Sequence, residues 1–135
     1  MKPTFIDTNI FLRFLVKEDE RSYKASANLL KAIAEGDVLG FTSVLVIAEI
    51  VWVLNSFYKF PRDKIANAVQ SLLELPNLEV EQDPIIHGAL DYFLQTKAGF
   101  IDCYNHAWMV EHGIDHVATF DSDWDTFNDV SRAKL

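Results

Sequence analysis

Short apolar runs alternate with longer amphipathic segments along the chain, and this alternation restricts the fold more than any other feature. Four runs read as strands, and segments with helical periodicity separate each from the next. The runs are Thr4–Ile6, Val38–Thr42, Leu78–Val80 and His116–Phe120. Parallel strands need a crossover long enough to hold a helix, so the pattern predicts an α/β fold with a central parallel sheet flanked by helices on both faces. In such folds ligands bind at the carboxyl ends of the strands.

Capping residues and helix breakers set the expected helix bounds. Gly36 ends one helix, Pro76 stops another, and Gly113 supplies a left-handed residue at the end of a third. Each expected helix carries an apolar stripe or is apolar almost all round. The helices are expected at about Asn9–Val16, about Glu20–Glu35, from the cap at Thr42–Ser43 to Leu54, from Pro61 to the stop at Pro76, about Pro84–Gln95 and Asp102–Glu111, with a short one after Asp121.

The 135 residues, half of them hydrophobic, suffice for a single domain spanning 1–135 with a substantial core. No apolar stretch approaches the ~20 residues of a membrane span, and the N-terminus lacks a signal-peptide pattern, so we expect a cytoplasmic protein without membrane contact. The single cysteine, Cys103, is expected to be a small core residue. The four histidines show no HxxxH or HxH spacing, and a zinc site is not expected.

Four acidic residues border the apolar segments. Asp7 ends the first apolar run and Asp121 ends the last. Asp102 follows an apolar pair, and Glu49 lies within the most apolar helix. An isolated buried carboxylate is costly, so four of them make sense mainly if they converge on cations. At separations of about 5 Å and an effective dielectric of about 20, each ionised pair repels by about 3 kcal/mol, which divalent cations or raised pKa values would relieve.

A structural interpretation competes with this metal site. Asp7 and Asp102 each precede an expected helix, and either could be a helix N-cap. Glu49 resists that interpretation because its helix is apolar almost all round and is therefore expected to be buried. The alternative for Glu49 is a carboxylate that reaches the surface or caps a neighbouring helix.

The net charge of −8 argues against a nucleic-acid partner, but the charges are unevenly distributed. Residues 1–64 carry nine basic and eight acidic side chains, whereas residues 65–135 carry three basic and twelve acidic ones. The basic residues of the first half could form one basic face, or they could be ordinary solvated helix surface. Arg13 stands out because it follows Asn9 by four residues and faces the same way. It could contact a phosphate or form a salt bridge with Glu18.

The acidic motifs, taken in order, resemble those of the PIN-domain ribonucleases, and within that family those of VapC-type toxins. The resemblance spans the whole chain. It rests on Phe5-Ile6-Asp7-Thr8-Asn9, Ile47-Ala48-Glu49-Ile50, Phe100-Ile101-Asp102-Cys103 and Ala118-Thr119-Phe120-Asp121-Ser122-Asp123-Trp124. Trp124 stands where many members of the family have phenylalanine, which keeps an aromatic residue at that place.

The resemblance implies a PIN-like nuclease domain that acts as an Mg²⁺- or Mn²⁺-dependent endoribonuclease. It implies Asp7, Glu49, Asp102 and Asp121 as catalytic metal ligands, with Asp123 as a further acidic ligand. It also implies that Asn9 and Thr119 support these ligands. RNA as substrate, a homodimer and a small antitoxin that blocks the cleft follow from the same likeness. Carboxylates without histidine or cysteine suit hard cations such as Mg²⁺.

Two other functions also use clustered acidic residues. In the first, the acidic pocket holds the arginines of a partner protein and catalyses nothing. In the second, the chain is a receiver-type phosphoacceptor, which needs an aspartate at the end of a central strand and a lysine near the end of a late strand. Neither Val38–Thr42 nor Leu78–Val80 supplies that aspartate, and residues 98–131 contain no lysine.

Overall fold

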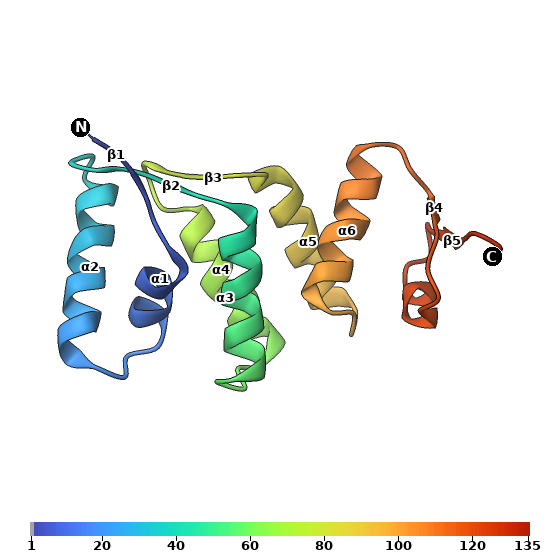
Figure 1. The fold of residues 1–135 in the computed structure, drawn as a ribbon, viewed down its shortest axis with the longest axis horizontal. Coiled ribbons are helices and arrows are strands. Elements are labelled where there is room, and N and C mark those ends of the chain that lie inside the picture. The colour runs from blue at the N-terminus through green and yellow to red at the C-terminus, as the bar shows by residue number, and fades with distance from the viewer. Residues whose placement is uncertain (1) are drawn as a thin grey trace. The chain divides into compact units, whose positions relative to one another are not determined.

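The computed structural model of the chain describes residues 2–135 (Figure 1). The chain forms two compact units, which we call unit 1, up to Asp83, and unit 2, from Pro84 to Leu135. Among the described residues, no helix is both long and apolar enough to span a bilayer.

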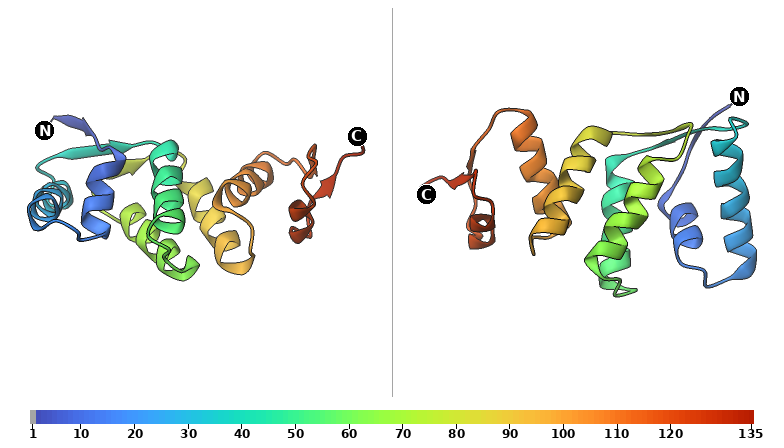
Figure 2. Two further views of the ribbon diagram at one scale, coloured as in Figure 1. Left: turned by 60° about the horizontal axis from the view of Figure 1, so that its bottom comes forward. Right: turned by 180° about the vertical axis from the view of Figure 1, so that it is seen from behind.

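Unit 1 contains a three-stranded parallel sheet with the order β1-β2-β3. Two helices connect each strand to the next, as the alternation of apolar runs predicted. The elements are β1 (Pro3–Phe5), α1 (Thr8–Leu15), α2 (Glu20–Ala34), β2 (Leu39–Thr42), α3 (Val44–Ser56), α4 (Arg62–Leu73) and β3 (Leu78–Val80). All four helices extend from the sheet towards the same side, and the α1–α2 and α3–α4 connections lie at the helix ends away from the sheet (Figures 1 and 2).

Unit 2 begins with two helices and ends in a small parallel strand pair. Its elements are α5 (Asp83–Gln95), α6 (Phe100–Glu111), β4 (His116–Val117), a 3₁₀ helix η1 (Ser122–Thr126) and β5 (Ser131–Arg132). The strands β4 and β5 pair in parallel, with His116 opposite Ser131. The helical segments and the α/β class agree with the sequence predictions.

Buried aromatic residues fix the C-terminal segment of unit 2. The ring of His106, in α6, is fully buried and lies 4.1 Å from the ring centroids of both Tyr92 and Phe127. Its Nε2 atom is 2.7 Å from Oδ1 of Asp129. Trp124 is also buried, 5.3 Å from Phe127 between ring centroids, so the aromatic residue expected there packs into the core. Aromatic burial and one polar contact thus hold η1 and the residues after it against the helices.

The structure corrects some of the predicted bounds. The strand predicted at His116–Phe120 ends at Val117, and Phe120 is 91% exposed, so this apolar run does not continue as a buried strand. The strand β5 was not predicted. Cys103 is fully buried, as expected for a core residue.

Candidate acidic site

Asp7 lies in unit 1, two residues after the end of β1. It has the extended backbone of a helix N-cap, and its Oδ1 accepts a hydrogen bond from the Thr8 amide at 2.9 Å. The Thr42 hydroxyl, buried at the end of β2, donates to the Ile6 carbonyl at 2.9 Å and so fixes the chain just before Asp7. The Asp7 carboxylate itself is exposed. The residue therefore caps α1 while presenting its carboxylate to solvent, so the cap does not exclude a ligand role.

Glu49 also lies in unit 1, but the prediction of a buried carboxylate is wrong. The helix α3 buries Val46, Ile47 and Ile50, whereas Glu49 is exposed. Leu45 and Trp52, which share its face of the helix, are 77% and 67% exposed. The helix is apolar almost all round, yet one stripe of it faces outward.

Asn9 and Arg13 follow Asp7 along α1, and both are exposed. The positive charge of Arg13 lies close enough to Asp19 to favour the ionised carboxylate. The lowered pKa of Asp19 comes mainly from hydrogen bonds with Ser22, and Arg13 adds a smaller effect.

Asp102 lies in unit 2, and the structure excludes its interpretation as an N-cap. The helix α6 begins at Phe100, with Gly99 as its N-cap, so Asp102 is the third residue of the helix. Its side chain is partly buried, and burial raises the pKa of its carboxyl. The charges of Asp121 and Asp123 raise that pKa further. The carboxylates of Asp121 and Asp123 are therefore close enough to Asp102 to disfavour its ionised form.

Hydrogen bonds order the segment that carries Asp121 and Asp123. The Asp121 amide donates to the Thr119 hydroxyl at 3.0 Å, and the Asp123 amide donates to Oδ1 of Asp121 at 2.8 Å. Asp121 thereby caps η1, and Thr119 fixes the backbone of Asp121. Asp121 and Asp123 are both exposed.

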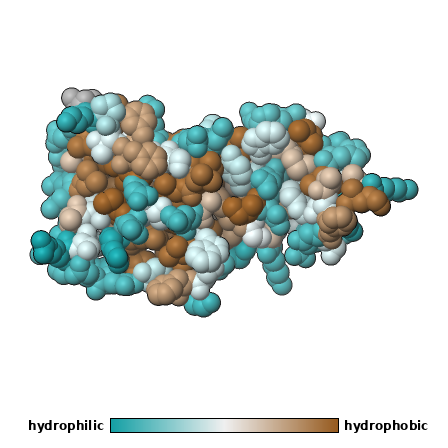
Figure 3. Space-filling model, in the orientation of Figure 1, coloured by the Kyte–Doolittle hydropathy of each residue, from teal (hydrophilic) through white to brown (hydrophobic). Residues whose placement is uncertain are grey.

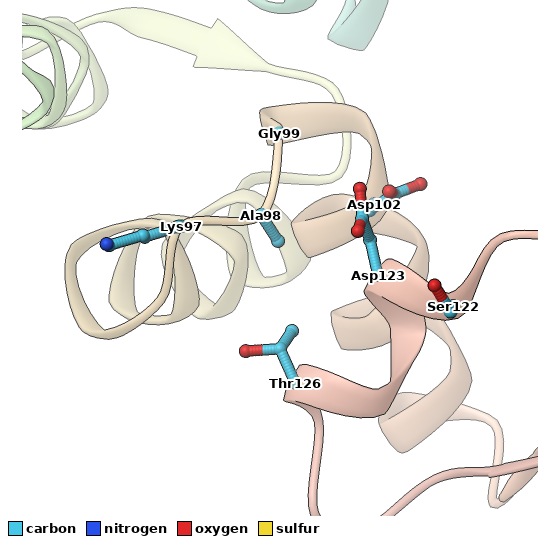
Figure 4. A pocket seen from close by; sticks show the side chains of 7 residues that line it. All are labelled: Lys97, Ala98, Gly99, Asp102, Ser122, Asp123 and Thr126. Atoms are coloured by element: carbon cyan, nitrogen blue, oxygen red, sulfur yellow. The ribbon is translucent and has the colours of Figure 1, made fainter.

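Asp102 and Asp123 line one pocket of unit 2 with a volume of about 370 Å³. The other lining residues are Lys97, Ala98, Gly99, Ser122 and Thr126. The Lys97 amine points away from the two carboxylates, and the Ser122 hydroxyl lies on their side of the pocket (Figure 4). Ser122 and Thr126 were not predicted from the sequence, although both lie within five residues of Asp121, and that proximity was the one signal that could have indicated them.

The donor set of unit 2 suits a hard divalent cation, because Asp102 and Asp123 offer carboxylate oxygens to one pocket. Within each unit as described, no group of three or more His, Cys, Asp or Glu side chains is arranged to hold a metal ion. The chemistry of the residues therefore fits Mg²⁺ or Mn²⁺, and the convergence of all four acids on such an ion stays a prediction.

Comparison with known proteins identifies the family. The chain is 29% identical over 115 residues to a VapC ribonuclease from Aquifex aeolicus (strain VF5), covering 85% of this chain and 84% of that protein. The crystal structure of Mycobacterium tuberculosis VapC20, a sarcin-ricin loop cleaving toxin, aligns with a TM-score of 0.41 and 19% identity, covering 93% of this chain and 94% of that one. The PIN domain family matches residues 4–132, nearly the whole chain. The chain therefore belongs to the PIN domain family.

Proposed function

We propose that this chain is a divalent-metal-dependent endoribonuclease and the toxin of a toxin-antitoxin pair. It hydrolyses phosphodiester bonds of RNA in the cytoplasm. The proposal combines the PIN family match with the similarity to a VapC ribonuclease. The structural observation that carries it is the pocket lined by Asp102 and Asp123, where burial and the charges of Asp121 and Asp123 raise the pKa of the Asp102 carboxyl. A protein has little reason to maintain such repulsion unless a cation relieves it.

The residues of this chain have distinct roles in the proposal. Asp7, Glu49, Asp102 and Asp121 are the acidic ligands, and Asp123 is a further one. Thr119 holds the Asp121 backbone through the hydrogen bond described above. Asn9 and Arg13 extend along α1 from Asp7, where Asn9 supports the ligands and Arg13 binds a nonbridging phosphate oxygen.

The cation in this proposal is Mg²⁺ or Mn²⁺, held by the carboxylates. When bound, such an ion lowers the pKa of a bound water and stabilises charge that develops on the phosphate. The protein's own contribution is to hold the ligands in place before the ion binds. The Asp123 amide holds the Asp121 carboxylate, and the Thr8 amide holds that of Asp7.

Cleavage of labelled RNA by the purified protein, free of any partner, tests the function. Cleavage should require Mg²⁺ or Mn²⁺ and stop in chelator, and Asp7→Asn and Asp121→Asn should each lower the rate by orders of magnitude. Asp37→Asn and Asp91→Asn are matched controls, because both aspartates are exposed and belong to unit 1 and unit 2 respectively. If Asp7→Asn or Asp121→Asn kept near wild-type activity in a nuclease-free preparation, that residue would not be catalytic.

We further propose a homodimer and a small antitoxin that occupies the acidic cleft. Sedimentation of the purified chain tests the dimer, and inhibition of cleavage by the product of an adjacent small gene tests the antitoxin. A non-catalytic module that holds arginines of a partner is not favoured, since the similar protein from Aquifex aeolicus is a ribonuclease. Absence of metal-dependent cleavage together with tight binding of an arginine-rich peptide would support that alternative.

A further inference from the structure

A cluster of aromatic and basic residues lies where α3 ends and α4 begins. We call the four residues Phe57, Tyr58, Lys59 and Phe60, together with Lys64, the aromatic tip. Phe57 follows α3 as its C-cap residue and is 72% exposed. Lys59 and Lys64 give the tip two positive charges in a chain of net charge −8, with Asp63 as the sequence neighbour of Lys64.

Backbone hydrogen bonds join the aromatic tip to the end of α3. The amides of Phe57 and Tyr58 donate to the Val53 carbonyl at 3.0 and 3.2 Å, and the Phe60 amide donates to the Leu54 carbonyl at 2.9 Å. Lys59 adopts a left-handed conformation, with φ 57°, which is unfavourable for a residue other than glycine. This left-handed residue lets the chain turn within the tip and leaves the Lys59 side chain exposed.

The rings of the tip contact one another and a cation. Phe57 and Tyr58 meet edge to face with centroids 4.9 Å apart, and Tyr58 and Phe60 lie 6.3 Å apart. The Lys64 ammonium lies 4.0 Å from the centroid of the Phe60 ring, a cation–π contact. Figure 3 shows hydrophobic and hydrophilic side chains side by side at the lower end of unit 1, where α3 ends.

The α1–α2 connection contributes to the same surface. The Tyr58 hydroxyl donates to the Glu18 carboxylate, and this hydrogen bond is the main reason why the pKa of Tyr58 is raised. Burial and the Glu18 charge raise that pKa further, whereas the nearby positive charge of Arg13 lowers it. The positive charge of Arg13 is therefore near enough to act on Tyr58, and Figure 2 shows both connections at the ends of the helices away from the sheet.

From these contacts we propose that the aromatic tip is a binding platform for single-stranded RNA, on which an unpaired base stacks against Phe57 while Lys59, Lys64 and Arg13 contact phosphates. Exposed aromatic rings beside positively charged side chains are how proteins bind single strands without reading their sequence. The platform rests on the proposed ribonuclease function for the identity of the polyanion. Phe57 lies eight residues after Glu49 on α3, about 12 Å along the helix axis, so a strand held at the tip reaches the acidic residue.

Fluorescence anisotropy of a labelled RNA oligonucleotide tests the platform. The background variant is Asp121→Asn in chelator, so that binding is measured without cleavage. Phe57→Ala should weaken binding of a single-stranded 12-mer by roughly 5- to 100-fold. Phe57→Leu should weaken binding equally, because it keeps apolar area but loses the ring, and Phe57→Trp should bind at least as tightly as the parent. A duplex of the same length should be less affected, since its bases are already stacked.

Trp108→Ala is the control, because Trp108 is also an exposed aromatic residue but lies on α6, outside the tip and outside the α3 face that carries Glu49. Lys59→Gln and Lys64→Gln each remove one positive charge from the tip. The slope of the logarithm of the RNA association constant against the logarithm of the salt concentration should then become shallower by about 0.7 for each phosphate that is no longer neutralised. Far-UV circular dichroism checks that each variant folds.

The outcomes separate the platform from the proposed function. If Phe57→Ala or Phe57→Leu bound single-stranded RNA as tightly as the parent, or lost no more affinity than Trp108→Ala, the platform would be wrong even if the wild-type protein cleaves RNA. If the tip variants lost affinity and the wild-type protein cleaved no RNA with any divalent ion, the platform would stand and the nuclease assignment would fail.

Discussion

Asp102 could be either a helix N-cap or a carboxylate of the acidic site, and its position in the structure distinguishes these two roles. A helix N-cap is expected to accept a hydrogen bond from the first turn, but Asp102 is already inside α6 and Gly99 is the cap. Its carboxyl is partly buried near two other carboxylates, and both conditions disfavour its ionised form. Although a carboxylate in the first turn of a helix interacts favourably with the helix dipole, we expect burial and the neighbouring charges to outweigh that effect, so that Asp102 lowers the stability of the metal-free protein.

The first prediction concerns the stability of Asp102→Asn without metal. The folded pKa of Asp102 lies above its usual value of 3.8, so the folded state binds this proton more tightly than the unfolded state does. The resulting contribution to stability is present below pH 3.8 and is lost as the pH rises through the raised pKa. Asp102→Asn should therefore melt at the same temperature as wild type or higher at neutral pH, with its advantage growing as the pH rises.

Thermal melts across acidic and neutral pH, read by circular dichroism, measure this effect. Asp91→Asn is the control, since Asp91 is an exposed residue of α5 in the same unit. A loss of about 1 kcal/mol at every pH, with or without Mg²⁺, is what a capping residue would give, and it would contradict the prediction.

Thr119 is the subject of the second prediction. Its hydroxyl accepts a hydrogen bond from the Asp121 amide. Thr119→Val removes this acceptor while keeping the branched shape of the side chain. The unfolding free energy should fall by only about 1 kcal/mol, since the amide is exposed to water. If Thr119 positions Asp121, RNA cleavage should show a kcat lowered by about tenfold at nearly unchanged KM, corresponding to about 1.4 kcal/mol in the transition state. Thr119→Ser should restore the rate, and failure of that rescue would assign the loss to packing.

Most helices and strands could be located from local sequence signals, such as residues that end helices or form turns. The left-handed residues Gly36, with φ 87°, and Gly113, with φ 69°, stand at the helix ends where the sequence placed them. The strand Leu78–Val80 has the predicted bounds, because its apolar residues are bracketed by turn residues. The strand β5 has only two residues, both exposed, so no apolar pattern marked it.

The candidate site was less predictable than the elements that carry it. The acidic residues were chosen because they border apolar segments, and their convergence on one site stays a prediction; Asp121 and Asp123 are near enough to Asp102 to raise the pKa of its carboxyl. The burial of Glu49 was predicted wrongly from the composition of α3. An almost wholly apolar helix suggests burial on every side, but packing against the rest of the protein decides which stripe of the helix faces outward. The position of Asp102 within α6 was also missed, because Phe100 and Ile101 are apolar and carry no capping signal.

The third prediction concerns how α2 is joined to β3. Asn77 has a left-handed backbone, with φ 64°, and its side-chain amide donates to the carbonyls of Ile33 and Ala34 at 3.1 and 3.3 Å. Asn77→Gly keeps the backbone conformation but loses these bonds, and should cost about 1 kcal/mol of unfolding free energy. Asn77→Ala also strains the backbone and should cost about 2 kcal/mol. Urea unfolding measures both values, and an Asn77→Ala protein as stable as Asn77→Gly would show that the left-handed conformation relaxes.

At the scale of the whole molecule, the uneven charge has two consequences. The second half carries three basic and twelve acidic side chains, and the carboxylates of the pocket belong to it. A divalent cation that binds there stabilises the folded chain by mass action, whereas simple screening depends only on ionic strength. The first half, nearly neutral in total, carries the aromatic tip. Substitutions of the pocket carboxylates and of the aromatic tip therefore test the proposed cation binding and the proposed RNA binding separately, because these two sets of residues lie in different halves of the chain.

Cys103 carries the only thiol of the chain and is buried. Its rate of reaction with a thiol reagent therefore measures how often this part of the protein opens. Its sulfur is fully buried in α6 and donates to the Ala98 carbonyl at 3.7 Å, so a thiol reagent reaches it only when this part of unit 2 opens. As the fourth prediction, Cys103 should react slowly in the native protein, and Mg²⁺ should slow it further than NaCl of equal ionic strength. Asp102→Asn should abolish that difference, as followed by mass spectrometry. A reaction as fast as that of a free thiol would mean that α6 is open most of the time, and the acidic pocket beside it would then be assembled only by its ligand.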